Sequence, residues 1–172
     1  MTYSDFTLER ALREFDLDPD EADLYQGHDE CPISEVRRQM GRRIGLFSGT
    51  AFDVDPEPGL GGWIDFVLTR SPLQVILRAP VCVIVEAKND NIKDGLGQCI
   101  ATMVAAQLSN ERAGEGPSII HGAVTTGSLW RFLRLADLSV TYDRTEYLVD
   151  QPGKIVAAHV HGVGELSTPI AA

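Results

Sequence analysis

A chain of 172 residues is long enough to form one domain with a substantial core, and its 44% hydrophobic and 23% charged residues are typical of a soluble globular protein. No apolar run reaches the roughly 20 residues that span a bilayer, and the N-terminus lacks the features of a signal peptide. We therefore expect a cytoplasmic protein with no membrane partner, and the net charge of −10 argues against tight binding to duplex DNA through charge alone.

The acidic residues are concentrated at the N-terminus. Residues 1–35 carry 11 acidic and two basic side chains, a balance of −9, whereas the remainder carries 14 acidic and 13 basic side chains, a balance of −1. We therefore predict an acidic helical N-terminal segment over residues 1–45 and a near-neutral domain over residues 46–172, together forming a single globular unit. One basic cluster fits a solvated helix face and a phosphate contact equally well; it comprises Arg37, Arg38, Arg42 and Arg43.

Taken in chain order, the hydrophobic pattern predicts alternating helices and strands. Apolar residues at positions 8, 11, 12 and 15 predict a first helix, and Asp18-Pro19 either ends it or begins a second short one. A short helix over 33–44 follows. Strands are expected over 46–54, 63–69, 81–88, 118–126, 129–135 and 140–149, the last at a sheet edge, with helices over 92–110 and from Pro152 onward. This order predicts an α/β fold with a central mixed β-sheet flanked by α-helices.

The three cysteines form neither a paired framework nor a CxxC motif. Cys82 lies in an expected strand and Cys99 in an expected helix. We therefore predict buried, reduced thiols for the cysteines, which also include Cys31.

Three charged residues lie within or at the ends of apolar strands. Asp65 interrupts the apolar run 63–68, and the apolar strand 81–85 leads directly into Glu86-Ala87-Lys88. Side chains alternate along a strand, so Glu86 and Lys88 face the same side. If a hairpin sets Asp65 beside them, two carboxylates and one ammonium group converge. Adjacent carboxylates repel each other unless a divalent cation lies between them, so we predict a magnesium-type site suited to attack on a phosphodiester.

Each of these charged groups, taken alone, is more often a solvated residue at the end of a strand. Their placement within apolar runs favours the site, because charged side chains are rarely buried without a partner.

The pattern resembles the PD-(D/E)xK nuclease superfamily, which has the restriction-endonuclease-like fold, and within it a bacterial branch. The resemblance rests on Asp65, on Glu86-Ala87-Lys88 at the end of an apolar strand, and on Gln98 in the helix that follows. The runs 95–99 and 103–107 extend it, and it covers roughly residues 46–163. The resemblance implies a restriction-endonuclease-like core.

The resemblance also assigns roles. Asp65, Glu86 and the backbone carbonyl of Ala87 are expected to ligate one or two Mg²⁺ (or Mn²⁺) ions, and Glu35 is the candidate to complete the metal shell. Lys88 is expected to orient or deprotonate the attacking water and to stabilise the charge that develops.

The same resemblance places Gln98 beside the site, as in superfamily members of the recombination-nuclease type. Those members carry a tyrosine four residues later, whereas this chain has Thr102.

The expected function is therefore hydrolysis of nucleic acid, DNA in the first instance, by a magnesium-dependent endonuclease or related phosphodiesterase. One alternative is a catalytically inactive nuclease-fold module used for nucleic-acid or protein binding. Another is a small-molecule or protein-interaction domain in which Glu86 and Lys88 form only a structural ion pair. The acidic segment and the short helix that follows it are also compatible with a homodimer that exchanges elements.

Overall fold

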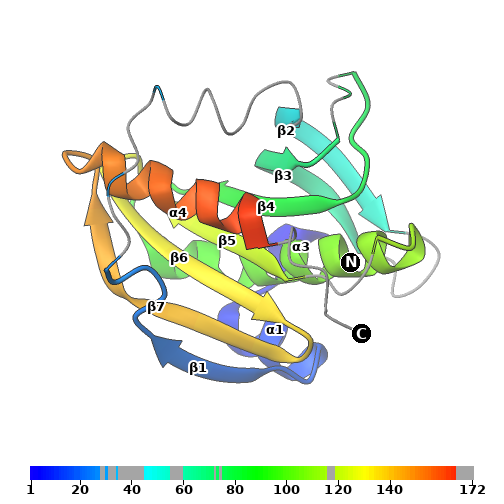
Figure 1. Cartoon of the computed structure of the whole chain (residues 1–172). Coiled ribbons are helices and arrows are strands. Elements are labelled where there is room, and N and C mark those ends of the chain that lie inside the picture. Colours follow the sequence, from blue (N-terminus) through cyan, green and yellow to red (C-terminus); the bar gives the residue numbers. More distant parts are fainter. Residues whose placement is uncertain are drawn as a thin grey trace, which may run out of the picture.

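The chain forms an α/β structure in which helices cover both faces of one mixed β-sheet (Figure 1). The structure is a computed structural model that describes residues 1–27, 30, 34, 45–54, 60–71, 73, 75–115 and 119–165. Its elements are η1 (Tyr3–Asp5), α1 (Leu8–Glu14), β1 (Asp18–Ala22), β2 (Gly45–Val54), β3 (Leu60–Thr69), β4 (Val81–Ala87), α3 (Ile92–Arg112), β5 (Ile120–Thr125), β6 (Leu129–Ala136), β7 (Ser139–Leu148) and α4 (Pro152–Glu165).

The seven strands form one sheet in the order β1-β7-β6-β5-β4-β3-β2. β1 pairs with β7, and β4 with β5, in parallel, whereas the other neighbours are antiparallel. The parallel step from β4 to β5 runs through α3, because parallel neighbours need a long crossover. β4 therefore has a strand on each side and helices over both faces, and its residues 81–85 are all at most 5% exposed. This position explains why its sequence is continuously apolar.

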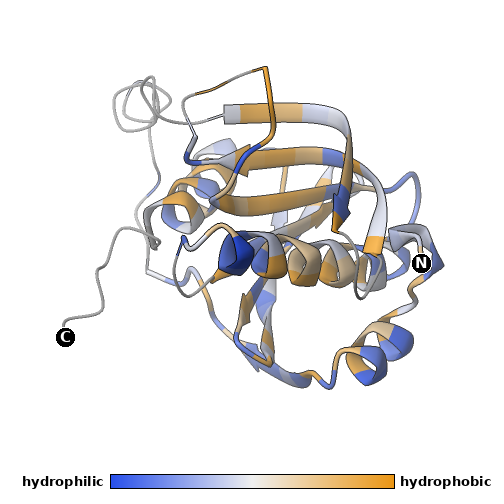
Figure 2. Cartoon of the chain, turned by 90° about the vertical axis from the view of Figure 1, so that its right-hand side faces the viewer, coloured by the Kyte–Doolittle hydropathy of each residue, from blue (hydrophilic) through white to orange (hydrophobic). Residues whose placement is uncertain are grey.

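Two hydrophobic layers lie on opposite faces of the sheet. One lies beneath α3, α1 and η1 and includes Ile84 and Ile100. The other lies beneath α4 and includes Val83 and Ile155. Ile84 and Val83 are consecutive in β4, so the alternation of strand side chains sends one to each layer. Figure 1 shows α3 and α4 on opposite sides of the sheet, and Figure 2 shows hydrophobic residues concentrated on the strands and on α3.

Most of the predicted elements are confirmed within a few residues of their expected ends. The prediction at Asp18-Pro19 was wrong, because residues 18–22 form β1, which pairs with β7. β7 is consequently not an edge strand. Proline cannot donate a ladder hydrogen bond, and it is tolerated here because β1 itself lies at the edge.

Several expectations fall wholly or partly outside the described residues. These are Glu35, Cys31, the arginines of the basic cluster and, apart from Ser34, the predicted helix over 33–44. Cys82 and Cys99 are buried free thiols, as predicted for these two. Among the helices described, none is both long and apolar enough to cross a membrane.

Candidate functional site

Asp65 and Glu86 meet on adjacent antiparallel strands. β3 and β4 pair Phe66 with Val85, and continuing this register by one residue sets Asp65 opposite Glu86. The carboxylate of Asp65 also accepts a hydrogen bond from the backbone N–H of Ala87, with a distance of 2.7 Å from nitrogen to Oδ2. The structure thus brings together the two carboxylates that the sequence places 21 residues apart.

Gln98 of α3 connects this carboxyl pair to Lys88. Its side-chain amide donates to Glu86 Oε2 at 2.8 Å, and its side-chain oxygen accepts from Lys88 Nζ at 2.6 Å. One amide group therefore holds both ends of the Glu86-Ala87-Lys88 segment against the helix. The chain Lys88–Gln98–Glu86, with Asp65 opposite, contains all four side chains predicted for the site within the described part of the molecule.

Local sequence features set α3 close to these groups. The Asn91 side chain accepts a hydrogen bond from the Lys93 N–H at 3.0 Å and so caps the first turn of α3, one short turn after Lys88. Gly95 then lies beside the lysine stem, since a Cβ there would lie 2.9 Å from Lys88 Cγ and 2.5 Å from a methyl group of Val124. The absence of a side chain at Gly95 lets Lys88 reach Gln98.

Glu86 is fully buried, and this changes its acid–base behaviour. Burial raises its pKa from 4.5 to about 8, with a further contribution from the charge and hydrogen bonding of Asp65. The charge of Lys88 and the hydrogen bond from Gln98 oppose this rise in the pKa. Without a cation, this pKa favours the protonated form of Glu86 at neutral pH.

The donor set suits a hard divalent cation. Glu86 Oε1 is buried and accepts no hydrogen bond from a described residue, and buried oxygens usually have a donor or a cation beside them. Asp65 lies beside Glu86 and accepts a hydrogen bond from the Ala87 N–H. The N–H and C=O of one strand residue point to the same edge, so the Ala87 carbonyl also points toward Asp65. Carboxylate and carbonyl oxygens are the ligands that Mg²⁺ prefers. The described residues hold no group of three or more histidine, cysteine, aspartate or glutamate side chains placed to bind a metal, and Glu35 lies outside them.

The N-terminal segment contributes neighbours that the sequence did not reveal. Tyr3 is 1% exposed, and burial raises the pKa of its hydroxyl, with further contributions from the charges of Asp53 and Glu86. A Cβ on Gly97 would collide with the backbone of Phe6 and Thr7, so this segment packs directly on α3 one residue before Gln98. A close contact between backbone segments distant in sequence produces no periodic pattern in the sequence. The glycine at position 97 is the feature that reflects this contact.

Thr102 lies one helical turn after Gln98. Its hydroxyl donates to the Gln98 carbonyl at 2.9 Å, and the side chain is buried. Where the recombination-type members carry a tyrosine, this chain therefore has a threonine whose hydroxyl bonds to the backbone of α3.

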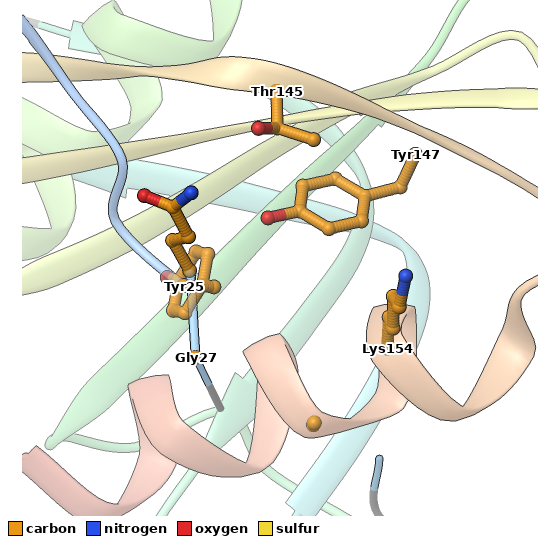
Figure 3. A pocket seen from close by; sticks show the side chains of 7 residues that line it. Tyr25, Gly27, Thr145, Tyr147 and Lys154 are labelled. Atoms are coloured by element: carbon orange, nitrogen blue, oxygen red, sulfur yellow. The ribbon is translucent and has the colours of Figure 1, made fainter. Parts of the chain in front are cut away.

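A separate pocket of about 170 Å³ lies toward α4, on the other face of the sheet (Figure 3). Tyr147 donates to Asp143 at 3.1 Å, and the Tyr25 hydroxyl lies 2.7 Å from His121 Nδ1, so both phenol groups have internal partners. The residues that line the pocket include none of those predicted for the site; they are Tyr25, Gln26, Gly27, Thr145, Tyr147, Lys154 and Ala157.

Comparison with known proteins adds no assignment to this geometry. Neither the family models nor the curated proteins searched give a match to this sequence.

Proposed function

We propose that the protein is a magnesium-dependent nuclease of the PD-(D/E)xK type that hydrolyses phosphodiesters in DNA, built on a restriction-endonuclease-like core. One observation carries the proposal: a buried glutamate, one of whose oxygens accepts no hydrogen bond from a described residue, faces a second carboxyl group, and an amide links it to a lysine. Burying such groups lowers the stability of the fold, so their presence favours a functional role.

In this proposal Asp65, Glu86 and the Ala87 carbonyl would hold the cation, which would supply positive charge beside the phosphate and favour ionisation of a water molecule. Lys88 donates hydrogen bonds to the attacking water or to the phosphate oxygens as negative charge develops. Gln98 positions this lysine, because its oxygen accepts from Nζ while its amide group is fixed on Glu86.

Thermal unfolding with and without divalent cations tests the metal site. Mg²⁺ or Mn²⁺ should raise the midpoint, since a ligand that binds the folded state at about 100 times its Kd stabilises it by about 2.7 kcal/mol. Asp65→Asn should abolish this rise. An unchanged midpoint in the wild-type protein would contradict the assignment of a cation to this pair.

A cleavage assay on single-stranded and duplex DNA tests the chemistry. Lys88→Ala should lower cleavage about 100-fold or more, as is usual when a group that stabilises developing charge is removed. The matched control is Lys93→Ala, which removes an exposed lysine from the first turn of α3. Equal activity of the Lys88→Ala and Lys93→Ala variants would rule out the role given to Lys88.

A second candidate is a catalytically inactive module of the same fold that binds nucleic acid or protein. It is favoured by the absence, within the described ranges, of a third acidic, histidine or cysteine ligand at the carboxyl pair. Metal-dependent stabilisation without cleavage would select this candidate. The predicted homodimer also stays a proposal, and sedimentation of the full chain tests it.

A further inference from the structure

The pocket on the α4 face of the sheet is held in shape by internal contacts. It lies between β7, α4 and the chain that follows β1 (Figure 3). The Tyr147 hydroxyl donates to Asp143 at 3.1 Å, and the Tyr25 hydroxyl lies 2.7 Å from a ring nitrogen of His121. Both phenol rings also pack edge-on against Phe132, with centroids 5.3 Å apart in each pair. A ligand could therefore bind between these rings without first ordering them.

The lining of the pocket combines aromatic surface with one positive charge. Lys154 is the only charged side chain among the seven described residues that line it. Its side chain extends from α4 toward β7 (Figure 3). Thr145 and Gln26 add uncharged hydrogen-bonding groups, and burial raises the pKa of the Tyr147 hydroxyl, so that phenol is neutral. A ligand that matches this lining needs one anionic group.

Two carboxyl groups lie near the pocket without lining it. Asp143 lies behind Tyr147, is 1% exposed and has a raised pKa, chiefly because of burial. Glu30 lies against Gly153 at the start of α4, where a Cβ on the glycine would be 3.1 Å from Glu30 Oε2. Within the part of the chain that the structure describes, neither forms an ion pair with Lys154. The ammonium group is therefore available to a ligand.

The size of the pocket limits the body of that ligand. The cavity volume is about 170 Å³, and a protein cavity of about 150 Å³ takes up one benzene molecule. Aromatic rings also attract one another in offset and edge-to-face contacts, which two tyrosine rings can provide. A single ring with one carboxylate matches the volume, the aromatic lining and the charge. Inorganic phosphate has no ring to contact the tyrosines.

We propose that this pocket binds a small aromatic carboxylate, with its ring against Tyr25 and Tyr147 and its carboxylate at Lys154. The pocket and the proposed nuclease site lie on opposite faces of the sheet and share no residue. The inference therefore stands or fails independently of the proposed function.

A chemical-shift titration of the isotope-labelled full chain with sodium benzoate tests the proposal, with sodium chloride at equal ionic strength as the reference. The amides of Thr145, Tyr147 and Ala157 should shift and saturate along one binding curve. Lys154→Gln should weaken benzoate binding about fivefold to tenfold, because it removes a charge-assisted hydrogen bond at an accessible site. The matched control Lys93→Gln removes an exposed lysine of α3 and should leave the affinity unchanged.

Two other ligands and one further variant test the ring. Cyclohexanecarboxylate keeps the charge but has no π-face, so it should bind about threefold more weakly or worse. Inorganic phosphate should cause no saturable shift at the same amides. Ala157→Leu places a larger side chain in the pocket lining and should abolish benzoate binding, and circular dichroism establishes whether this variant is folded. If it does not fold, the lysine variants and the ligand series decide the matter.

Three results would overturn the proposal. The first is the absence of saturable shifts with benzoate. The second is equal benzoate affinity in the Lys154→Gln and Lys93→Gln proteins, which would exclude a carboxylate at Lys154. The third is binding of cyclohexanecarboxylate or phosphate as tight as that of benzoate, which would show that the tyrosine rings do not select the ligand.

Discussion

Glu86→Gln should make the cation-free protein more stable at neutral pH. In the folded state the pKa of Glu86 is raised to about 8, chiefly by burial and next by the Asp65 carboxylate. The unfolded chain releases the same proton near pH 4.5. The stability that the protonated carboxyl provides is thus fully present below about pH 4.5 and is lost as the pH rises toward 8. Glutamine copies the shape of the protonated acid but does not titrate.

The size of the effect follows from the two pKa values. Each pH unit above the pKa of the unfolded chain costs the folded state about 1.4 kcal/mol until Glu86 ionises. Between about pH 5 and about pH 7.5 the wild-type protein should therefore lose about 3 kcal/mol of stability relative to Glu86→Gln. This is a large share of the 5–15 kcal/mol typical of a domain.

Urea unfolding in EDTA, followed by far-UV circular dichroism at both pH values, measures this difference. Glu111→Gln is the control, because Glu111 is exposed on α3 and should change the pH dependence little. If the wild-type and Glu86→Gln stabilities run parallel across this pH range, Glu86 is already ionised in the folded protein and its pKa is not raised. Added Mg²⁺ should offset the loss in the wild-type protein and have no effect on Glu86→Gln.

Three further predictions concern the framework of the site. Gly97→Ala should destabilise the protein by several kcal/mol in urea unfolding, because its Cβ collides with backbone of the N-terminal segment, whereas Gly164→Ala, a helical glycine with open space around it, should be neutral or slightly stabilising. Asn110→Ala should cost about 2–3 kcal/mol and speed amide exchange at Val81, because the buried Asn110 side chain bonds to both the N–H and the C=O of Val81 at 2.8 Å. Burial lowers the pKa of His159, so the folded protein holds it neutral where the unfolded chain takes up a proton. Stability should therefore fall as the pH drops below about 6.5, and His159→Phe should flatten that slope in a pH series of unfolding midpoints.

The sequence by itself indicates the four proposed site side chains of the described region. Asp65, Glu86 and Lys88 could be placed because each breaks or ends an apolar run whose strand period is visible locally. Gln98 came from the resemblance, and its bridging role between Lys88 and Glu86 appeared only in the structure.

The features that only the tertiary structure determines arise from interactions between residues that are distant in sequence. Three features depend on groups that are distant in sequence: the pairing of β1 with β7, the close backbone contact that leaves no room for a side chain at Gly97, and the burial that raises the pKa of Glu86. The hydrophobic periodicity and the turn residues determine where helices and strands form, because both act between residues that are close in sequence. Burial of side chains and pairing of distant strands determine which faces of the helices and strands pack together. These interactions contribute to stability only once the sheet is assembled.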